Sequence, residues 1–372
     1  MHEQELHSLS FLRNAGKKVY LKGGKVVLVG KYSKELLSRR GRKKFYTKDI
    51  EKPLFEIWKS SGFVSSKHLE AYIRMNWDKI YKELGHLFET EEKVYKIRGI
   101  SAATIDRLLK RYRRMMELKN KGRGNPFSTK LKRSFQVESW FDKKRELGEV
   151  EIDLVHHCGE SGYGEFIYTL TVTEITTGWT ELIPLRNKAM VWTVNALKEV
   201  IKNFPIKIKR IHTDNGSEFI NSHLFRFCQE SGIEFLRSRP YRKNDAPYVE
   251  SKNWSLVRQY TGWRRYDTEE EYKILRKLMK LVSIRHNLIV PQMKVVEKHR
   301  INGRKIKRYE IDTPLNRILR VEDVGEEVKR RFMSLRDNIK ILKLTQAIIK
   351  LQSELDRAYN RKRSLKWASE LQ

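Results

Sequence analysis

The stretch His212-Thr-Asp-Asn-Gly-Ser-Glu-Phe219 places Asp214 where an apolar strand is predicted to end. Glu250 follows 36 positions later and opens a predicted helix, and Asp153 stands upstream in the short apolar strand Val150–Val155. A strand, a strand end and a helix would thus deliver three carboxylates. Such a cluster suits Mg²⁺ or Mn²⁺, because these ions prefer oxygen ligands.

The three carboxylates suffice for phosphodiester chemistry with two metal ions. In such a site the ions lie roughly 3.5–4 Å apart, where one activates the attacking oxygen and the other stabilises the departing one. No His or Cys nucleophile is needed. We therefore expect two Mg²⁺ (or Mn²⁺) ions at Asp153, Asp214 and Glu250.

Each carboxylate also has a purely structural interpretation. Asp153, which alternates with Ile152 and Leu154, could be an exposed strand residue. Asp214 could form an Asx-type turn, and Glu250 could simply favour a helix N-terminus. The combination at this spacing is much less expected by chance than any one of the three.

The net charge of the 372 residues points to a polyanionic partner. Lys and Arg number 78 against 46 Asp and Glu, which gives +32. Residues 150–234 nevertheless carry a net −3. An acidic island in a basic chain fits a metal centre flanked by surfaces that hold phosphates. Composition alone also allows a ribosomal-type or merely soluble basic protein.

The remaining composition limits the compartment and the class. With only Cys158 and Cys228, a disulfide framework is excluded and a reducing compartment is expected. No signal peptide and no run of 18 apolar residues occurs, so we expect no membrane span.

The first 120 residues read as a hairpin followed by helices. KKVYLKGGKVVLVG at 17–30 predicts a hairpin with Gly23-Gly24 as its turn. Helical periodicity predicts one helix ending at Gly62, a second from Leu69 to Ile80 and a third after Ile100. They suggest a helix-turn-helix module that points three residues toward DNA: Thr104, Arg107 and Arg111. An ordinary three-helix bundle with a solvated basic face remains the alternative.

The pattern changes from Val150 onward. Strands are predicted at 150–155, 166–172, 180–185, 206–212 and 233–237, with helices at 190–204 and 217–231. Three strands followed by alternating helix and strand indicate an α/β fold with a mixed sheet. Helices follow at 248–260, which carries Glu250, and at 268–290.

The C-terminal part combines a basic hairpin with helices. Residues 291–310 surround an Asn302-Gly303 turn and carry seven Lys/Arg against two Glu. Beyond Val321 an apolar heptad runs through Val328, Leu335, Leu342 and Ile349, with Phe332 and Ile339 four positions on. This seam predicts packing either within one chain or between two.

These motifs resemble those of DDE transposases of bacterial insertion sequences, which have a retroviral-integrase-type catalytic core. The resemblance rests on VEIDLVHHCG (150–159), HTDNGSEF (212–219) and RSRPYRKNDAPYVESKNWSLVR (237–258). It covers about 150 to 290 strongly, and the helix-turn-helix front and DTPLNRIL (312–319) loosely. It implies an RNase H-like core whose metal-binding triad is Asp153, Asp214 and Glu250.

The resemblance also implies DNA contacts near the glutamate helix. Transposon-end DNA would face Lys252, Asn253 and Arg258 on that helix, and Arg242 and Asn244 in the preceding loop. The zinc domain of the retroviral relatives is missing, so the helix-turn-helix would recognise the ends. Residues His156, His157 and Cys158 could bind zinc, but a packing or hydrogen-bonding role is favoured.

We interpret the chain as a metal-dependent transposase with five regions. They are a hairpin and helix-turn-helix region (1–120), a basic linker (121–145), the catalytic core (146–290), a small basic β segment (291–320) and a helical region (321–372). The chain would cleave double-stranded DNA at terminal inverted repeats and join the 3′-hydroxyl to target DNA. Joining two ends requires at least a dimer on DNA. We expect it at the nucleoid in the bacterial cytoplasm.

Two other functions remain open from the sequence. The same fold could serve an RNase H-like nuclease that hydrolyses without strand transfer. A transposase-derived DNA-binding protein with a dead active site is the second alternative, against which the three intact carboxylates argue.

Overall fold

The computed structural model describes residues 18–22, 25–29, 45–120, 146–213, 222–237, 247–301 and 304–370. The chain divides into two units, Met1–Thr47 and Lys48–Gln372. In the first unit β1 (Lys18–Lys22) pairs antiparallel with β2 (Lys25–Val29), which confirms the hairpin predicted at 17–30. The predicted basic linker, 121–145, lies outside the described residues.

The second unit begins with helices rather than strands. Their bounds are η1 Lys48–Ile50, α3 Glu51–Ser60, α4 Ser66–Met75, α5 Trp77–Leu84, η2 Gly85–Leu87, α6 Glu91–Arg98 and α7 Ala102–Asn120. The single helix predicted from Leu69 to Ile80 is wrong, because the chain breaks at Asn76 between α4 and α5. The Asn76 amide donates to the carbonyl oxygens of Tyr72 and Ile289, each at 3.1 Å, which stabilises the break.

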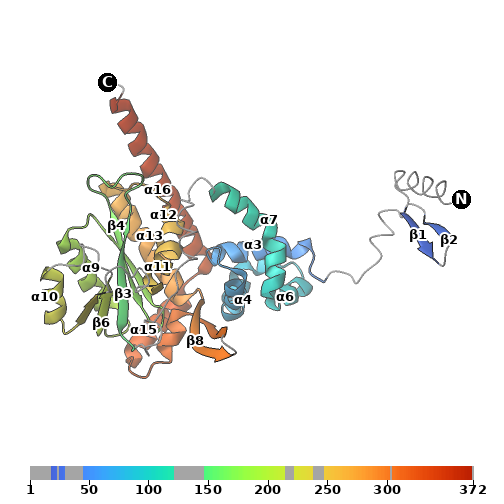
Figure 1. The fold of residues 1–372 in the computed structure, drawn as a ribbon, viewed down its shortest axis with the longest axis horizontal. Helices are drawn as coiled ribbons and strands as arrows, with labels where there is room; N and C mark the ends of the chain where they lie inside the picture. Colours follow the sequence, from blue (N-terminus) through green and yellow to red (C-terminus); the bar gives the residue numbers. More distant parts are fainter. Residues whose placement is uncertain are drawn as a thin grey trace. The chain divides into compact units, whose positions relative to one another are not determined.

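A five-stranded mixed sheet forms the centre of this unit (Figure 1). Its strands are β3 Glu149–His156, β4 Tyr168–Glu174, β5 Thr180–Leu185, β6 Arg210–Thr213 and β7 Glu234–Arg237. The order is β5-β4-β3-β6-β7, in which β3 pairs antiparallel with β4 and parallel with β6. Helices α9 (Met190–Asn203) and α10 (Ser222–Glu230) connect the last three strands. The predicted α/β fold with a mixed sheet is confirmed.

A run of helices covers the sheet and follows β7 in the chain. It comprises α11 (Pro247–Lys252), a π-helical segment (Asn253–Arg258), α12 (Gln259–Thr261) and α13 (Glu269–Leu288). Helix α13 begins with a capping box between Thr268 and Glu271. Its apolar side chains join those of β3 and the π segment in one buried cluster. One part of the core therefore lies between the sheet and the helices that follow β7.

The predicted basic hairpin is present as β8 (Gln292–Ile301) and β9 (Arg304–Asp312). Helices α14 (Pro314–Leu319), α15 (Glu326–Asn338) and α16 (Ile341–Glu370) complete the chain. None of the described helices is long and apolar enough to cross a membrane.

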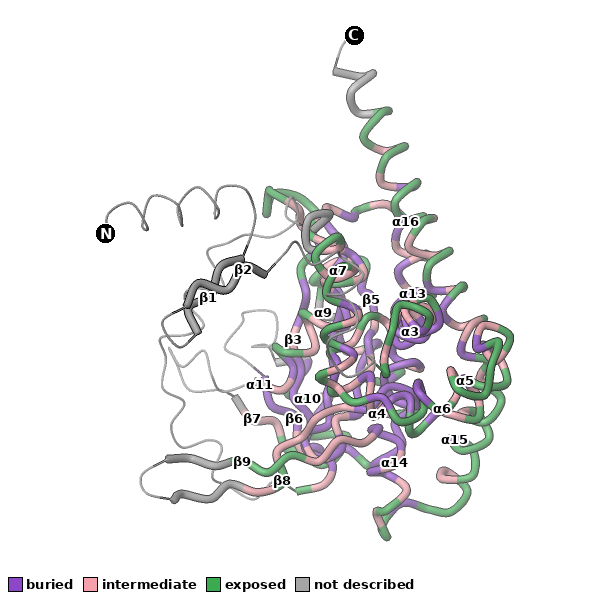
Figure 2. Tube along the Cα trace, turned by 90° about the vertical axis from the view of Figure 1, so that its right-hand side faces the viewer, coloured by how far each residue is buried: buried purple, intermediate pink, exposed green. Residues whose placement is uncertain are grey.

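The apolar seam predicted for the C-terminal helices is buried at Phe332, which is 8% exposed, but not along the rest of its length. Leu335 and Ile349 are 42% and 39% exposed, whereas Ile348 and Leu355 are 1% exposed in the core cluster. The helix is interrupted between α15 and α16, so the seven-residue repeat does not continue as one stripe. Figure 2 shows α15 mostly exposed, with burial concentrated in the sheet and α13. Helix α16 packs within this chain, against α13, α3 and α5.

Candidate active site

One face of β3 carries three carboxylates at alternate positions: Glu149, Glu151 and Asp153. Alternation along a strand sends these side chains to the same side of the sheet. Val155, the next residue on that face, joins the buried cluster of the π segment and α13. The acidic face of β3 is therefore the face that the Glu250 helix covers.

Glu151 holds the beginning of that helix. Its side chain is almost fully buried, at 1% exposed, and its Oε2 accepts the backbone N–H groups of Tyr248 at 2.8 Å and Val249 at 2.9 Å. The first amides of a helix have no partner within the helix, and a negative charge there is stabilising. Glu151 thus connects the central strand to the first turn of α11.

Asp153 connects β3 to the same helical run a second time, about one helical turn after Glu250. It is half-buried, and its Oδ2 accepts a hydrogen bond from Asn253 Nδ2 at 2.5 Å, while Oδ1 accepts the Leu154 N–H at 2.8 Å. Asn253 lies three positions after Glu250, which is the spacing of neighbours on one helix face. The helix face of Glu250, whose side chain is exposed, is therefore turned toward Asp153.

Asp214, the remaining carboxylate of the predicted triad, cannot be placed in the same way. β6 runs parallel to β3 and ends at Thr213, whose register partner is Ile152, next to Asp153. Asp214 follows in sequence and lies outside the described residues. Within the described part of the chain, no three His, Cys, Asp or Glu side chains are grouped so as to hold a metal ion.

A polar network supports the other end of the acidic strand. Glu149, 4% exposed, contacts His212 Nε2 through Oε2 at 3.1 Å and accepts from Arg210 Nη1 through Oε1 at 3.2 Å. Sequence reasoning missed the parts played by Glu149 and Glu151. Their signal was an acidic residue at every second position of a strand that is otherwise apolar.

The His156-His157-Cys158 run forms no zinc site in the described residues. The His157 ring is fully buried beside Tyr266, and its Nε2 hydrogen-bonds with Thr169 Oγ1 at 2.8 Å. Burial, with the charge of Arg258 nearby, lowers the pKa of His157 to about 3. His157 is thus a neutral packing residue at the end of β3.

Three residues predicted to contact DNA make contacts within the protein. Lys252 Nζ donates to Gln292 Oε1 at 3.2 Å, and burial lowers the Lys252 pKa to about 8. Asn253 binds Asp153, as described above. Arg258 donates to the His156 carbonyl at 2.6 Å and stacks 4.1 Å from the Trp263 ring centroid. Their roles toward DNA stay predictions.

The other predicted DNA contacts are on α7 and in a loop. Arg107 and Arg111 are exposed on α7, and Thr104 is half-buried near its start, where its backbone N–H donates to Ser101 Oγ at 3.4 Å. Arg242 and Asn244 lie outside the described residues. Helix α6 precedes α7 and was not predicted; Thr90 caps it by accepting the Lys93 N–H at 3.4 Å.

Comparison with known proteins agrees with this core. The Integrase core domain family matches residues 143–243. The chain is 34% identical over 270 residues to the uncharacterized protein y4rM of Sinorhizobium fredii. The aligned stretch covers 72% of this chain and 77% of y4rM. This chain belongs to the integrase-type transposase family. Its central sheet is an RNase H-like integrase core.

Some viral proteins are similar to parts of this integrase-type transposase. The Pro-Pol polyprotein of Simian foamy virus type 1 is 30% identical over 96 residues, which is 26% of this chain and 8% of the polyprotein. The catalytic core domain of BIV integrase is 16% identical with a TM-score of 0.31, over 46% of this chain and 93% of that chain. A chain of the simian T-cell lymphotropic virus intasome in complex with PP2A regulatory subunit B56 gamma is 12% identical with a TM-score of 0.33. The match covers 48% of this chain and 57% of that chain. The integrase core places the transposase among proteins of DNA recombination.

Proposed function

We propose that this transposase cleaves DNA at the ends of a bacterial insertion sequence and joins the freed 3′-hydroxyl to target DNA. The observation that carries the proposal is the double connection between β3 and the Glu250 helix, through Glu151 and Asp153. It connects the strand and the helical run that carry two of the three proposed catalytic carboxylates. Catalysis of phosphoryl transfer depends mainly on such positioning and on charge stabilisation.

Asp153, Asp214 and Glu250 would bind two divalent metal ions. The donor set fits, since carboxylate oxygens are hard ligands that suit Mg²⁺ or Mn²⁺, and the exposed Glu250 side chain leaves room for substrate oxygens. When bound, the ions supply Lewis-acid activation of the attacking oxygen and stabilise the leaving oxygen.

The chain's own residues would orient this site and hold the DNA. Asn253 keeps the Asp153 carboxylate turned toward the Glu250 helix, and Glu151 keeps the helix start in place. The net charge of +32 favours binding of the phosphate backbone. We propose that α7 reads the terminal repeats with Thr104, Arg107 and Arg111. Near the scissile strand, Lys252, Asn253 and Arg258 would act with Arg242 and Asn244.

A strand-transfer assay with pre-cleaved end oligonucleotides tests the reaction. We expect Mg²⁺-dependent joining to target DNA, lost on chelation with EDTA and restored by added Mg²⁺. Asp153→Asn, Asp214→Asn and Glu250→Gln should each abolish cleavage and joining while binding to end DNA persists. Hydrolysis without joining would instead identify a nuclease. Cleavage that survives any of the three substitutions would rule out the proposed triad.

The DNA-reading helix is tested separately. Arg107→Ala should weaken binding to terminal-repeat DNA more than binding to random DNA, because base contacts carry the sequence information. A footprinting assay compares binding to the terminal repeat with binding to random DNA. Unchanged selectivity would refute the role of α7.

Since two ends are joined in one reaction, we also propose a dimer or larger assembly on DNA.

A further inference from the structure

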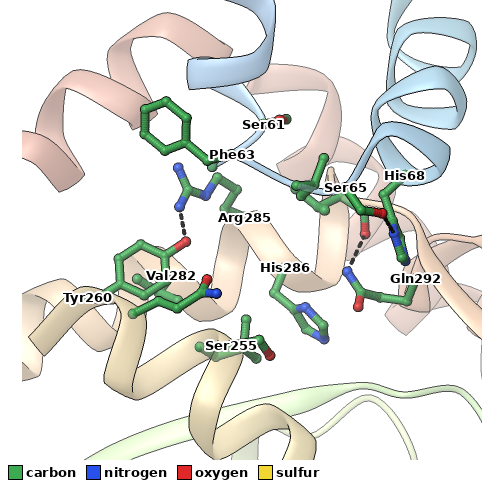
Figure 3. A pocket seen from close by; sticks show the side chains of 15 residues that line it. Ser61, Phe63, Ser65, His68, Ser255, Tyr260, Val282, Arg285, His286 and Gln292 are labelled. Carbon is green, nitrogen blue, oxygen red and sulfur yellow. Dashed lines mark hydrogen bonds between the residues drawn. The ribbon is translucent and has the colours of Figure 1, made fainter. Parts of the chain in front are cut away.

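A cavity of about 250 Å³ lies beside residues 255–260, which follow Glu250 in the same helical run (Figure 3). Its walls come from the chain between α3 and α4, from residues 255–260 and from the last turns of α13. An apolar cavity of about 150 Å³ is large enough for benzene. This cavity therefore has space for a ring and one additional polar group.

A buried positive charge faces this cavity. Arg285 is 4% exposed, and its Nη2 donates to the hydroxyl of Tyr260. No Asp or Glu lines the cavity, and Arg285 has no carboxylate partner within the described chain. A guanidinium group has five N–H donors, and buried charges are normally paired. A neutral hydroxyl does not compensate the charge, so the arrangement favours an anionic occupant.

The two histidines that line the cavity, His68 and His286, are neutral near pH 7. Burial, together with the charge of Lys252, lowers the pKa of His68 and of His286. His68 is also occupied, since its Nδ1 lies 2.7 Å from Ser65 Oγ and its Nε2 accepts the Met293 N–H. Arg285 is thus the permanent charge that a ligand would meet.

Much of the cavity wall is apolar. Phe63, Leu256 and Val282 line it, and Figure 3 shows the Arg285 guanidinium between the rings of Phe63 and Tyr260. Phe63 has φ of 61°, a conformation that side-chain-bearing residues rarely adopt. Backbone strain of this kind costs about 1–3 kcal/mol and concentrates where ligands bind. An occupant would therefore have an apolar body beside its charge.

We propose that this cavity binds a small organic anion, a carboxylate or phosphate monoester attached to an apolar ring or chain. The anionic group would pair with Arg285, and the body would pack against Phe63, Leu256 and Val282. The bound molecule would touch both residues 255–260, in the helical run that follows Glu250, and the chain that follows α3. This site is separate from the carboxylate cluster and does not depend on the transposase reaction.

Calorimetric titration of the full chain, supported by thermal unfolding, tests the site. Benzoate and phenyl phosphate represent the two anionic groups, and benzyl alcohol is the neutral control. We expect one of the anions to bind with 1:1 stoichiometry and to raise the Tm, while benzyl alcohol binds at least about tenfold more weakly. Comparison of the two anions identifies which group the cavity prefers.

Three variants complete the experiment. Arg285→Met should weaken anion binding at least about tenfold, and Ser255→Leu should block it by filling the cavity while Arg285 remains. Arg276→Met, on the same helix but paired with Glu199 at 3.0 Å, should bind like the wild type. If circular dichroism shows that Arg285→Met does not fold, Ser255→Leu decides. Wild-type binding in Ser255→Leu, equal binding of benzyl alcohol, or no binding of either anion would overturn the proposal.

Discussion

At the scale of single residues, Glu151 is the least expected member of the site. A buried carboxylate usually destabilises a fold unless hydrogen bonds compensate it. Here two backbone N–H groups at the start of α11 provide that compensation. The same contacts set the position from which Glu250 extends. Glu151 therefore acts as a positioning residue for a carboxylate on another element.

Replacement of Glu151 should disturb the position of Glu250 without weakening the binding of DNA. In Glu151→Leu the helix start loses both acceptors, and a displacement of about 1 Å at a reacting group can cost about 10²-fold in rate. We expect kcat for joining to fall by that order, with KM for DNA little changed. Glu151→Gln should recover much of the rate because its amide oxygen still accepts these hydrogen bonds. Equal rates in wild type and Glu151→Leu would contradict this role.

His157 should make stability depend on pH. Its pKa in the folded protein, about 3, lies below the ordinary value of about 6.5. Below pH 6.5 the unfolded chain therefore binds a proton that the folded chain does not, and the free energy of unfolding falls as pH drops toward 3. Urea unfolding at pH 7.5 and pH 5 measures the slope.

The matched variants for this pH effect are His157→Gln and His156→Gln. His157→Gln should reduce the loss of stability between pH 7.5 and pH 5. His156→Gln removes the neighbouring exposed ring and is the comparison for the loss of a histidine at this end of β3. If the slope is the same in His157→Gln and wild type, the buried ring does not carry the effect.

At the scale of elements, the end of α3 depends on the glycine that follows it. Gly62 has φ of +83°, and a Cβ at this position would lie 2.7 Å from Arg285 Nη2. Both the left-handed backbone and the close approach of the guanidinium therefore exclude a side chain. The sequence predicted that the helix ends here, but not what Gly62 contacts.

Gly62→Ala should destabilise the fold by about 1–2 kcal/mol, the cost of a left-handed L-residue, with a further cost if Arg285 must move. Gly162→Ala is the matched control, since nothing lies within 4 Å of its added Cβ and its φ is not in that region. Denaturant unfolding compares the two. A Gly62→Ala variant as stable as Gly162→Ala would show that neither strain nor crowding matters here.

At the scale of the whole molecule, α16 joins the amino-terminal helices to the integrase-type core. It contacts α13 beside the sheet and also α3 and α5. Glu83, in α5, accepts the backbone N–H groups of Ile341 and Leu342 at 2.8 Å each, at the start of α16. Regions far apart in the sequence thus share one core.

Leu355→Ala should therefore destabilise the whole second unit, by about 2–5 kcal/mol, as expected for a leucine removed from a packed core. Ile349→Ala, at an exposed position of the predicted heptad, should change stability by less than about 1 kcal/mol. Denaturant unfolding followed by tryptophan fluorescence measures both. A larger loss for Ile349→Ala than for Leu355→Ala would mean that the heptad is the packed face after all.

The α/β core, the strand that carries Asp153 and the helix that carries Glu250 could be predicted because they depend on local patterns. Alternating apolar residues identify β3, and turn residues mark its neighbours. The break at Asn76 could not be predicted, since it depends on a hydrogen bond to Ile289, more than 200 residues away. The buried face of α16 was missed for the same reason, because surrounding helices select which side of it is covered.

The sequence by itself determined the order of strands and helices, the integrase-type core and the strong basic charge, because these follow from local residue patterns and composition. Only the tertiary structure decided that Glu151 anchors the Glu250 helix, that Asn253 contacts Asp153 and that Arg285 is buried with no carboxylate partner among the described residues. Such contacts join residues about 100 or more positions apart, or depend on which groups share a cavity. They arise from packing, which no local pattern encodes.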